Sequence, residues 1–165
     1  MSHSRIYQIS SKRIAKDDYA SPSDFYDNSS DFADYIGDEI EDEDDRKEDI
    51  GQMADTLSDL FDLSDDGTAL VYKGAEAMKK FKQEWADAIR QAAQEITADN
   101  VLVSHPRWKL RSICEETHLR SSYRVSIEEW NTHASPMDEL IEWVDYKKFN
   151  TGKKIHVGAV IDYHY

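Results

Sequence analysis

The polar positions between residues 24 and 66 repeat at a spacing of three and four, which is typical of one face of a helix. Acidic residues occupy twelve of the thirteen positions in this repeat, and only Gln52 interrupts them. Apolar residues such as Phe25, Ile36 and Leu57 lie on the opposite side of a helical wheel. The pattern therefore predicts amphipathic helices with an acidic face. The acidic series consists of Asp24, Asp27, Asp31, Asp34, Asp38, Glu41, Asp45, Glu48, Asp55, Asp59, Asp62 and Asp66.

Glycines and a gap in the apolar pattern divide this segment. Gly37, Gly51 and the apolar-free run 41–49 would each weaken a helix. We therefore predict two helices, at about residues 23–40 and 46–62. If all neighbouring acids were helical, their repulsion would cost roughly 2–5 kcal/mol at low salt. This cost indicates that the acidic face serves a purpose other than folding.

The rest of the chain alternates between strand and helix patterns. A three-and-four spacing predicts one helix that carries the apolar positions Met78 to Ile96 and another at about 137–148. The stretch Arg107 to Leu119 is ambiguous. Alternating or β-branched residues predict strands, at about residues 5–10, 68–73, 101–104, 122–130 and 154–165. In the last of these, the odd-numbered residues from Ile155 to Tyr165 should share one apolar face.

These elements interleave without a regular strand–helix–strand repeat. The sequence therefore predicts an α+β fold with a mainly antiparallel sheet and three to four helices, two of them strongly acidic near the N-terminus. The length of 165 residues suits one domain, residues 1–165, with an acidic helical segment at 17–66.

Charge is divided unevenly along the chain. Residues 17–66 contain twenty acids and two bases, a net charge of −18, and the remainder has fourteen acids and eighteen bases, a net charge of +4, which together give −14. This asymmetry disfavours direct binding to nucleic acid or to an anionic membrane and favours a basic partner.

Cysteine usage and the N-terminal sequence favour a soluble cytoplasmic protein. Cys114 is the only cysteine, which excludes an intramolecular disulfide and a multi-cysteine metal site. The first residues lack the apolar region of a signal peptide, and no apolar run approaches the length of a membrane span.

The segment Asp62 to Gly67 matches the start of a calcium loop, with Asp62, Ser64 and Asp66 at the first ligand positions. However, the twelfth position, which should supply a bidentate carboxylate, is Lys73. A plain turn is the simpler interpretation, and we expect no calcium site.

Histidines offer a second possible metal site. Asp162 and His164 are two residues apart, so they share one face of the predicted last strand. His156 is too far from His164 to join them, because eight residues span about 26 Å in a strand. The other histidines lack ligand spacing, and a solvated strand face explains the group. We expect no metal and no cofactor.

Candidates for catalysis or for an apolar contact are few. Cys114 and His118 would be neighbours on a helix, but one such pair is weak support for a nucleophile, and we expect no enzyme activity. Trp85 lies on the apolar face of its predicted helix and should be buried. Trp143 lies off the apolar face of its own helix and is the better candidate for an interface.

Three functions remain open. The first is a non-enzymatic inhibitor that mimics nucleic acid and blocks the basic groove of a nucleic-acid-binding protein or nuclease, as anti-restriction, anti-CRISPR and immunity proteins do. Its acidic series and Trp143 would contact the partner. Eighteen acids in forty-three helical residues give about one charge per 3.6 Å, close to the roughly 3.4 Å per charge of a DNA strand. The second is a small α+β enzyme or metal protein that uses Asp162, His164, His118 and Cys114. The third is an interaction domain with a solvated acidic arm at 17–66.

Overall fold

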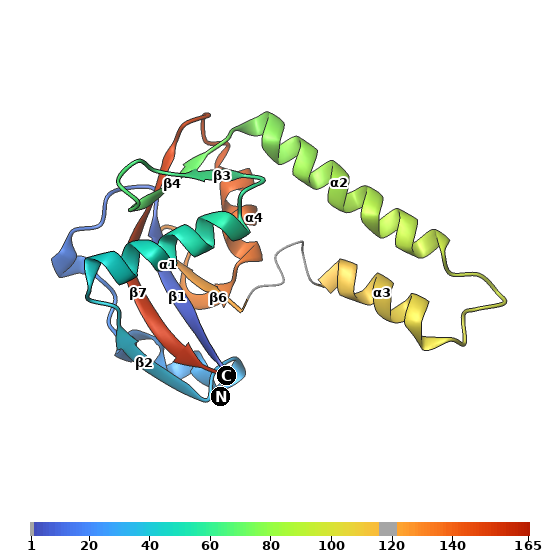
Figure 1. Ribbon diagram of the computed structural model, residues 1–165, viewed down its shortest axis with the longest axis horizontal. Coiled ribbons are helices and arrows are strands. Elements are labelled where there is room, and N and C mark those ends of the chain that lie inside the picture. The colour runs from blue at the N-terminus through green and yellow to red at the C-terminus, as the bar shows by residue number, and fades with distance from the viewer. Residues whose placement is uncertain (1, 116–121) are drawn as a thin grey trace.

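The strand β7 (Lys154–His164) organises the sheet (Figure 1). It pairs antiparallel with β1 (His3–Ser10) on one side and with β4 (Ala69–Tyr72) and β2 (Tyr35–Glu39) on the other. The computed structural model describes residues 2–115 and 122–165. Within them seven strands form one sheet in the order β3-β4-β7-β1-β5-β6, with β2 also beside β7. Only β1 and β5 are paired in parallel there, so the predicted α+β class with a mainly antiparallel sheet is confirmed.

Three more strands belong to the sheet, and helices pack on both of its faces. The remaining strands are β3 (Phe61–Leu63), β5 (Arg124–Ile127) and β6 (Asn131–Pro136). The described residues also form four α-helices and two 3₁₀ helices, more than the three to four helices predicted. They are α1 (Glu43–Thr56), α2 (Ala75–Gln94), α3 (Ser104–Glu115), α4 (Asp138–Lys147), η1 (Lys16–Asp18) and η2 (Pro22–Asp31).

A bulge in β7 changes which side chains face each side of the sheet. Tyr7 of β1 pairs with Val160, but Ile9 pairs with Val157, so β7 contains one extra residue. Gly158 lies in this bulge, where a Cβ atom would come within 2.4 Å of the Gln8 side-chain oxygen. Glycine allows this close approach of the two strands.

The bulge divides the apolar residues of β7 between two cores. The larger core joins one face of the sheet to α1, α4 and the first turns of α2. The smaller core lies on the other face, between η2 and strands that include β2 and β7. The predicted single apolar face of residues 154–165 is therefore wrong. Ile155, Val157 and Val160 belong to the larger core, and Ala159, Ile161 and Tyr163 belong to the smaller one.

Helices α2 and α3 extend away from the sheet as a helical arm (Figure 1). The apolar spacing from Met78 to Ile96 correctly predicts α2, although only its first turns reach the main core. The strand predicted at 101–104 is wrong, because these residues form a turn and the start of α3. Leu102 at this turn is 91% exposed. The ambiguous stretch after Arg107 is helical as far as Glu115, and residues 116–121 lie outside the described part.

The first predicted acidic helix, at 23–40, is wrong. Its residues form the 3₁₀ helix η2 and then the extended strand β2, whose backbone hydrogen bonds go to β7. The second, at 46–62, corresponds to α1, but α1 begins at Glu43 and ends at Thr56, ahead of β3. It starts where the Asp42 side chain accepts hydrogen bonds from two backbone N–H groups of the first turn.

Candidate binding surface and histidine cluster

The acidic series does not form one helix face, but every member of it is exposed. Its acids come from η2, from β2 and the residues around it, from α1, and from the segment 59–66. η2 packs on β2, β2 pairs with β7, and α1 packs against the sheet that contains both strands. The acids therefore reach solvent from several elements, some on η2 and β2 and others on α1 and beside β3.

Some of these carboxylates have a role in the fold. The Asp24 side chain accepts the backbone N–H of Ser21 at the start of η2, at 2.8 Å. Acids in the first turn of α1 interact favourably with the helix dipole. Asp66 accepts hydrogen bonds from Ser64 and Thr68, and these bonds lower the pKa of its carboxyl group.

Other carboxylates have no such role. Among residues 2–115 and 122–165, no hydrogen bond or ion pair holds their side chains, so folding alone does not account for their position. They are Asp27, Asp31, Asp34, Asp38, Glu41, Asp55 and Asp59.

The two bases of this segment do little to offset its surface charge. Arg46 is 2% exposed and turns inward. Its guanidinium donates to the backbone oxygens of Val157, at 2.7 Å, and Gly158, at 3.2 Å. Lys47 is therefore the only base of 17–66 that is exposed.

An open cavity of about 550 Å³ lies between η2 and the sheet. Five carboxylates line it, together with other residues that include Gln8 and His133. Sequence reasoning missed this acidic pocket, because three of its acids fall outside the three-and-four spacing and come from separate segments. The acids of the pocket are Asp17, Asp18, Asp24, Asp27 and Glu128.

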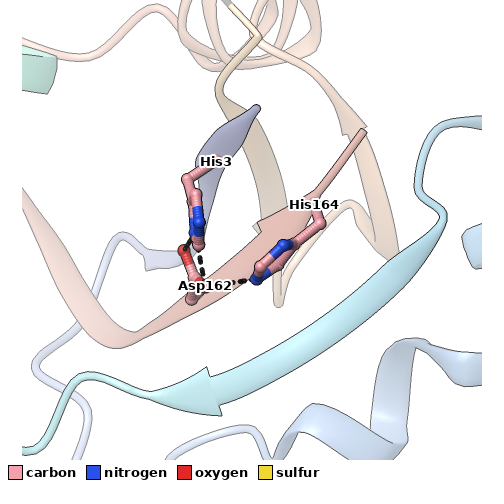
Figure 2. A group of neighbouring side chains, drawn as sticks. All are labelled: His3, Asp162 and His164. Atoms are coloured by element: carbon pink, nitrogen blue, oxygen red, sulfur yellow. Dashed lines mark hydrogen bonds and ion pairs between the residues drawn. The ribbon is translucent and has the colours of Figure 1, made fainter. Parts of the chain in front are cut away.

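A second polar group, the histidine cluster, consists of His3, Asp162 and His164 (Figure 2). His3 Nδ1 lies 3.1 Å and His164 Nε2 lies 3.2 Å from the same oxygen, Asp162 Oδ2. Asp162 and His164 are recognisable in the sequence as a pair. His3 is not, because it lies 159 residues before Asp162.

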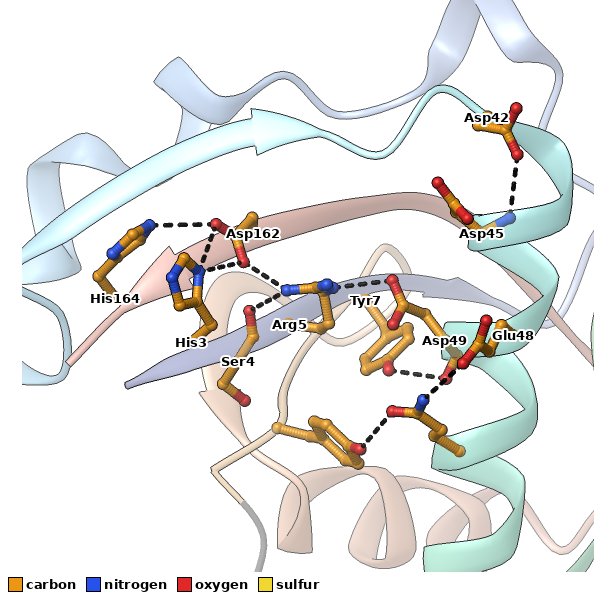
Figure 3. Close-up of polar contacts among 12 residues, drawn as sticks. His3, Ser4, Arg5, Tyr7, Asp42, Asp45, Glu48, Asp49, Asp162 and His164 are labelled. Atoms are coloured by element: carbon orange, nitrogen blue, oxygen red, sulfur yellow. Dashed lines mark hydrogen bonds and ion pairs between the residues drawn. The ribbon is translucent and has the colours of Figure 1, made fainter. Parts of the chain in front are cut away.

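Arg5 connects the histidine cluster to α1 (Figure 3). Its guanidinium contacts Asp162 Oδ1, and its Nε donates to Asp49 of α1 at 2.8 Å. Burial opposes the positive charge of Arg5, but the hydrogen bond and charge of Asp49, together with Asp162, raise the pKa of Arg5 overall. The Tyr7 hydroxyl donates to the Asp49 backbone oxygen, and burial raises the pKa of Tyr7.

Trp143 does not lie on the surface, contrary to prediction. It is fully buried in the main core against Phe149, because α4 is packed on more of its circumference than its short apolar face indicated. A partner therefore cannot contact it in this fold. Trp85, predicted to be buried, is only half-buried, and its ring nitrogen donates to the Ile113 backbone oxygen of α3.

Two further sequence candidates are the pair Cys114 and His118 and the segment that matches the start of a calcium loop. Cys114 is exposed on α3, and His118 lies outside the described residues. In the calcium-loop segment, Asp62 lies in β3, and a turn follows in which the hydroxyls of Ser64 and Thr68 hold Asp66. Lys73 Nζ lies 3.6 Å from Asp62 Oδ1. The ammonium group of Lys73, the residue at the twelfth loop position, therefore lies beside Asp62, the residue at the first.

Comparisons with models of known families, with curated proteins and with solved structures find no match for this chain. In the described ranges, each helix is too short or too polar to cross a membrane. The chemistry of the surface is therefore the main guide to function.

Proposed function

We propose that this protein is a non-enzymatic acidic binding protein whose carboxylates occupy the basic groove of a nucleic-acid-binding protein or nuclease. In this role it acts as a nucleic-acid mimic, of the anti-restriction, anti-CRISPR or immunity-protein type. The exposure of the whole acidic series carries this proposal. The fold keeps one base exposed in residues 17–66 and turns the other, Arg46, into the core.

Free carboxylates are suited to this partner. Arginine and lysine side chains that normally meet phosphates can bind carboxylates, and arginine can do so through two parallel hydrogen bonds. Asp31, Asp34 and Asp38 lie in and before the edge strand β2 without a partner of their own in the described chain. Acids also protect an edge strand from pairing with other strands. That protective role needs few charges and does not account for the acids on η2 and α1.

The acidic pocket adds a place for a single basic side chain. Its volume of about 550 Å³ lies within the usual range of ligand pockets, about 300–1,000 Å³. Asp27 belongs both to the acidic series and to the pocket wall. An arginine of the partner that enters here would meet several carboxylates at once.

The packing of the segment argues against a solvated acidic arm. Phe25, Ile36, Ile50 and Leu57 alternate with the acids, and each is at most 3% exposed. The acids are thus carried on elements that are part of the two cores. A rigid array binds with a smaller loss of conformational entropy than a disordered arm.

A competition experiment tests the proposal. A labelled DNA duplex is bound to each member of a panel of basic proteins, namely a restriction endonuclease, a CRISPR effector and a nuclease toxin. Addition of the acidic protein should displace the duplex from at least one of them, and high salt should weaken this effect. A pull-down at low and high salt, with the retained proteins identified, extends the search beyond the panel.

Two triple variants separate a specific surface from bulk charge. Asp31→Asn, Asp34→Asn and Asp38→Asn neutralise the β2 edge, whereas Glu76→Gln, Asp99→Asn and Glu142→Gln neutralise exposed acids elsewhere. Each triple changes the net charge from −14 to −11. Only the β2 triple should reduce binding. Equal loss in both triples, binding that is independent of salt, or no partner in either assay would contradict the proposal.

A cytoplasmic location belongs to the same proposal. It rests on Cys114, a free thiol that is exposed on α3. Such a thiol is typical of a reducing compartment. A restriction endonuclease or a CRISPR effector acts on DNA in that compartment as well, so the proposed partner and the proposed location agree.

A further inference from the structure

The histidine cluster is formed by the register of two strands. In the antiparallel pair of β1 and β7, His3 lies opposite His164, and Arg5 lies opposite Asp162. The bulge at Gly158 places Asp162 and His164 on the same face of the sheet as Tyr7 and α1. All three side chains of the cluster therefore converge at one end of the sheet (Figure 2).

The distances in the cluster match those between metal ligands. A zinc ion binds nitrogen and oxygen at about 2.0–2.2 Å, so the corners of its tetrahedron lie about 3.3–3.6 Å apart. Asp162 Oδ2 lies 3.1 Å from His3 Nδ1 and 3.2 Å from His164 Nε2. One ligand atom from each of the three residues lies within 4.8 Å of the others. A small shift of the side chains would bring them onto three corners of one tetrahedron.

The surroundings hold the carboxylate in position for such an ion. Arg5 binds Asp162 Oδ1 and is itself fixed by Asp49, which leaves Oδ2 directed at the two imidazoles (Figure 3). Groups that hold a ligand through its second atom are typical of metal sites. Gly37 of β2 lies against the same carboxylate, and a Cβ there would come within 3.0 Å of Asp162 Oδ2.

We propose that His3, Asp162 and His164 bind one divalent transition-metal ion, with zinc as the best fit. Two imidazoles and a carboxylate are ligands that zinc, cobalt and iron accept, whereas calcium and magnesium prefer oxygen alone. Three protein ligands leave a fourth position open. The His3 side chain is 58% exposed, so water or a side chain of a binding partner could occupy this position. This site lies beside β2, where Tyr35 pairs with His164, but it does not depend on the proposed function.

One feature limits the affinity of the site. His164 Nδ1 is buried, and no hydrogen-bond partner for it lies in the described part of the chain. In metal-bound histidines the N–H group of the second nitrogen usually donates a hydrogen bond to an acceptor. Loss of this acceptor lowers metal affinity about 10- to 100-fold. The site should therefore bind zinc more weakly than a fully supported site of the same ligands.

Metal titration of the untagged protein tests the proposal. Titration calorimetry should give one Zn²⁺ per chain, and Co²⁺ should give the intense visible absorption of tetrahedral coordination. His3→Gln and His164→Gln should each weaken binding at least about tenfold. His156→Gln, on the same strand but far from the cluster, is the matched control and should bind as the parent does.

Each result decides for or against the site. Binding that is lost in both cluster variants and retained in the control supports it, and a rise in Tm with added zinc should follow the same pattern. A requirement for His164 distinguishes the site from capture of metal by the chain terminus near His3. No binding of zinc or cobalt by the folded parent would mean that the cluster is only hydrogen-bonded. Equal binding by parent and cluster variants would place any metal elsewhere. Circular dichroism of each variant checks that the fold is retained.

Discussion

Replacement of Arg46 by methionine tests whether the buried guanidinium stabilises the fold. Methionine keeps an unbranched apolar side chain in the core but removes every donor. The backbone oxygens of Val157 and Gly158 then lose the hydrogen bonds that Arg46 makes at 2.7 and 3.2 Å. Its guanidinium also lies 5.1 Å from the centre of the Tyr19 ring, and that contact is lost as well.

The expected loss follows from these contacts. A buried acceptor left without its donor costs about 1–3 kcal/mol, so two carbonyls give about 2–6 kcal/mol. Removal of the need to dehydrate a charged group offsets part of this loss. We expect Arg46→Met to lower the free energy of unfolding by about 2–4 kcal/mol. With a urea m-value of about 2 kcal/mol/M, the unfolding midpoint should fall by about 1–2 M.

Urea unfolding followed by circular dichroism measures this change. Lys47→Met is the matched control, because it removes the same charge from the neighbouring residue, which is exposed. Its effect should stay within about 0.5 kcal/mol. If Arg46→Met were as stable as the parent or more stable, dehydration of the guanidinium would outweigh its hydrogen bonds. The inward turn of Arg46 would then lower stability rather than raise it.

Two further predictions concern Trp143 and Asp66. Trp143→Ala should destabilise the fold by about 3–5 kcal/mol in urea unfolding, because the side chain is fully buried. Trp143→Phe should cost much less, since Trp143 Nε1 has no hydrogen-bond partner in the described residues, and equal costs would contradict this reasoning. Asp66 should remain ionised below its ordinary pKa of 3.8, because hydrogen bonds from Ser64 and Thr68 lower its pKa. The stability from these bonds should be present above pH 3.8 and lost as the pH falls through the lowered pKa. Ser64→Ala should raise the NMR titration midpoint of the Asp66 carboxyl, and an unchanged midpoint would argue against these bonds.

The sequence predicted the elements in which the apolar spacing is regular. β4, α2, α4 and β7 all lie near their predicted ranges, because alternation or three-and-four spacing reports burial directly. β6 was not predicted, because its last residues, Ser135 and Pro136, are also typical of the start of a helix. The spacing of the acids gave a wrong helix at residues 23–40 for a different reason. Residues 35–39 gain a backbone partner in β7, and this tertiary pairing overrides the local helical pattern.

The histidine cluster shows why the site was harder to predict than the fold. Asp162 and His164 are visible as an alternating pair, and His3 with Arg5 forms a second such pair. Only the register of β1 against β7 brings the two pairs together, and the bulge at Gly158 sets the face on which they meet. Neither this register nor this bulge can be read from the sequence of one strand alone. A sequence signal did exist, since β1 and β7, the first and last of the described strands along the chain, carry complementary residues in mirrored order.

The central position of β7 has a consequence for how the protein is made. A ribosome synthesises this strand after every other strand of the sheet, yet β1, β2 and β4 all pair with it. During translation these strands remain without their shared neighbour, and both cores stay open to water. Contacts between strands so distant in sequence also form slowly. We therefore expect folding to begin only after residues 154–164 have left the exit tunnel, so a nascent chain that stalls before this point would expose apolar surface to chaperones.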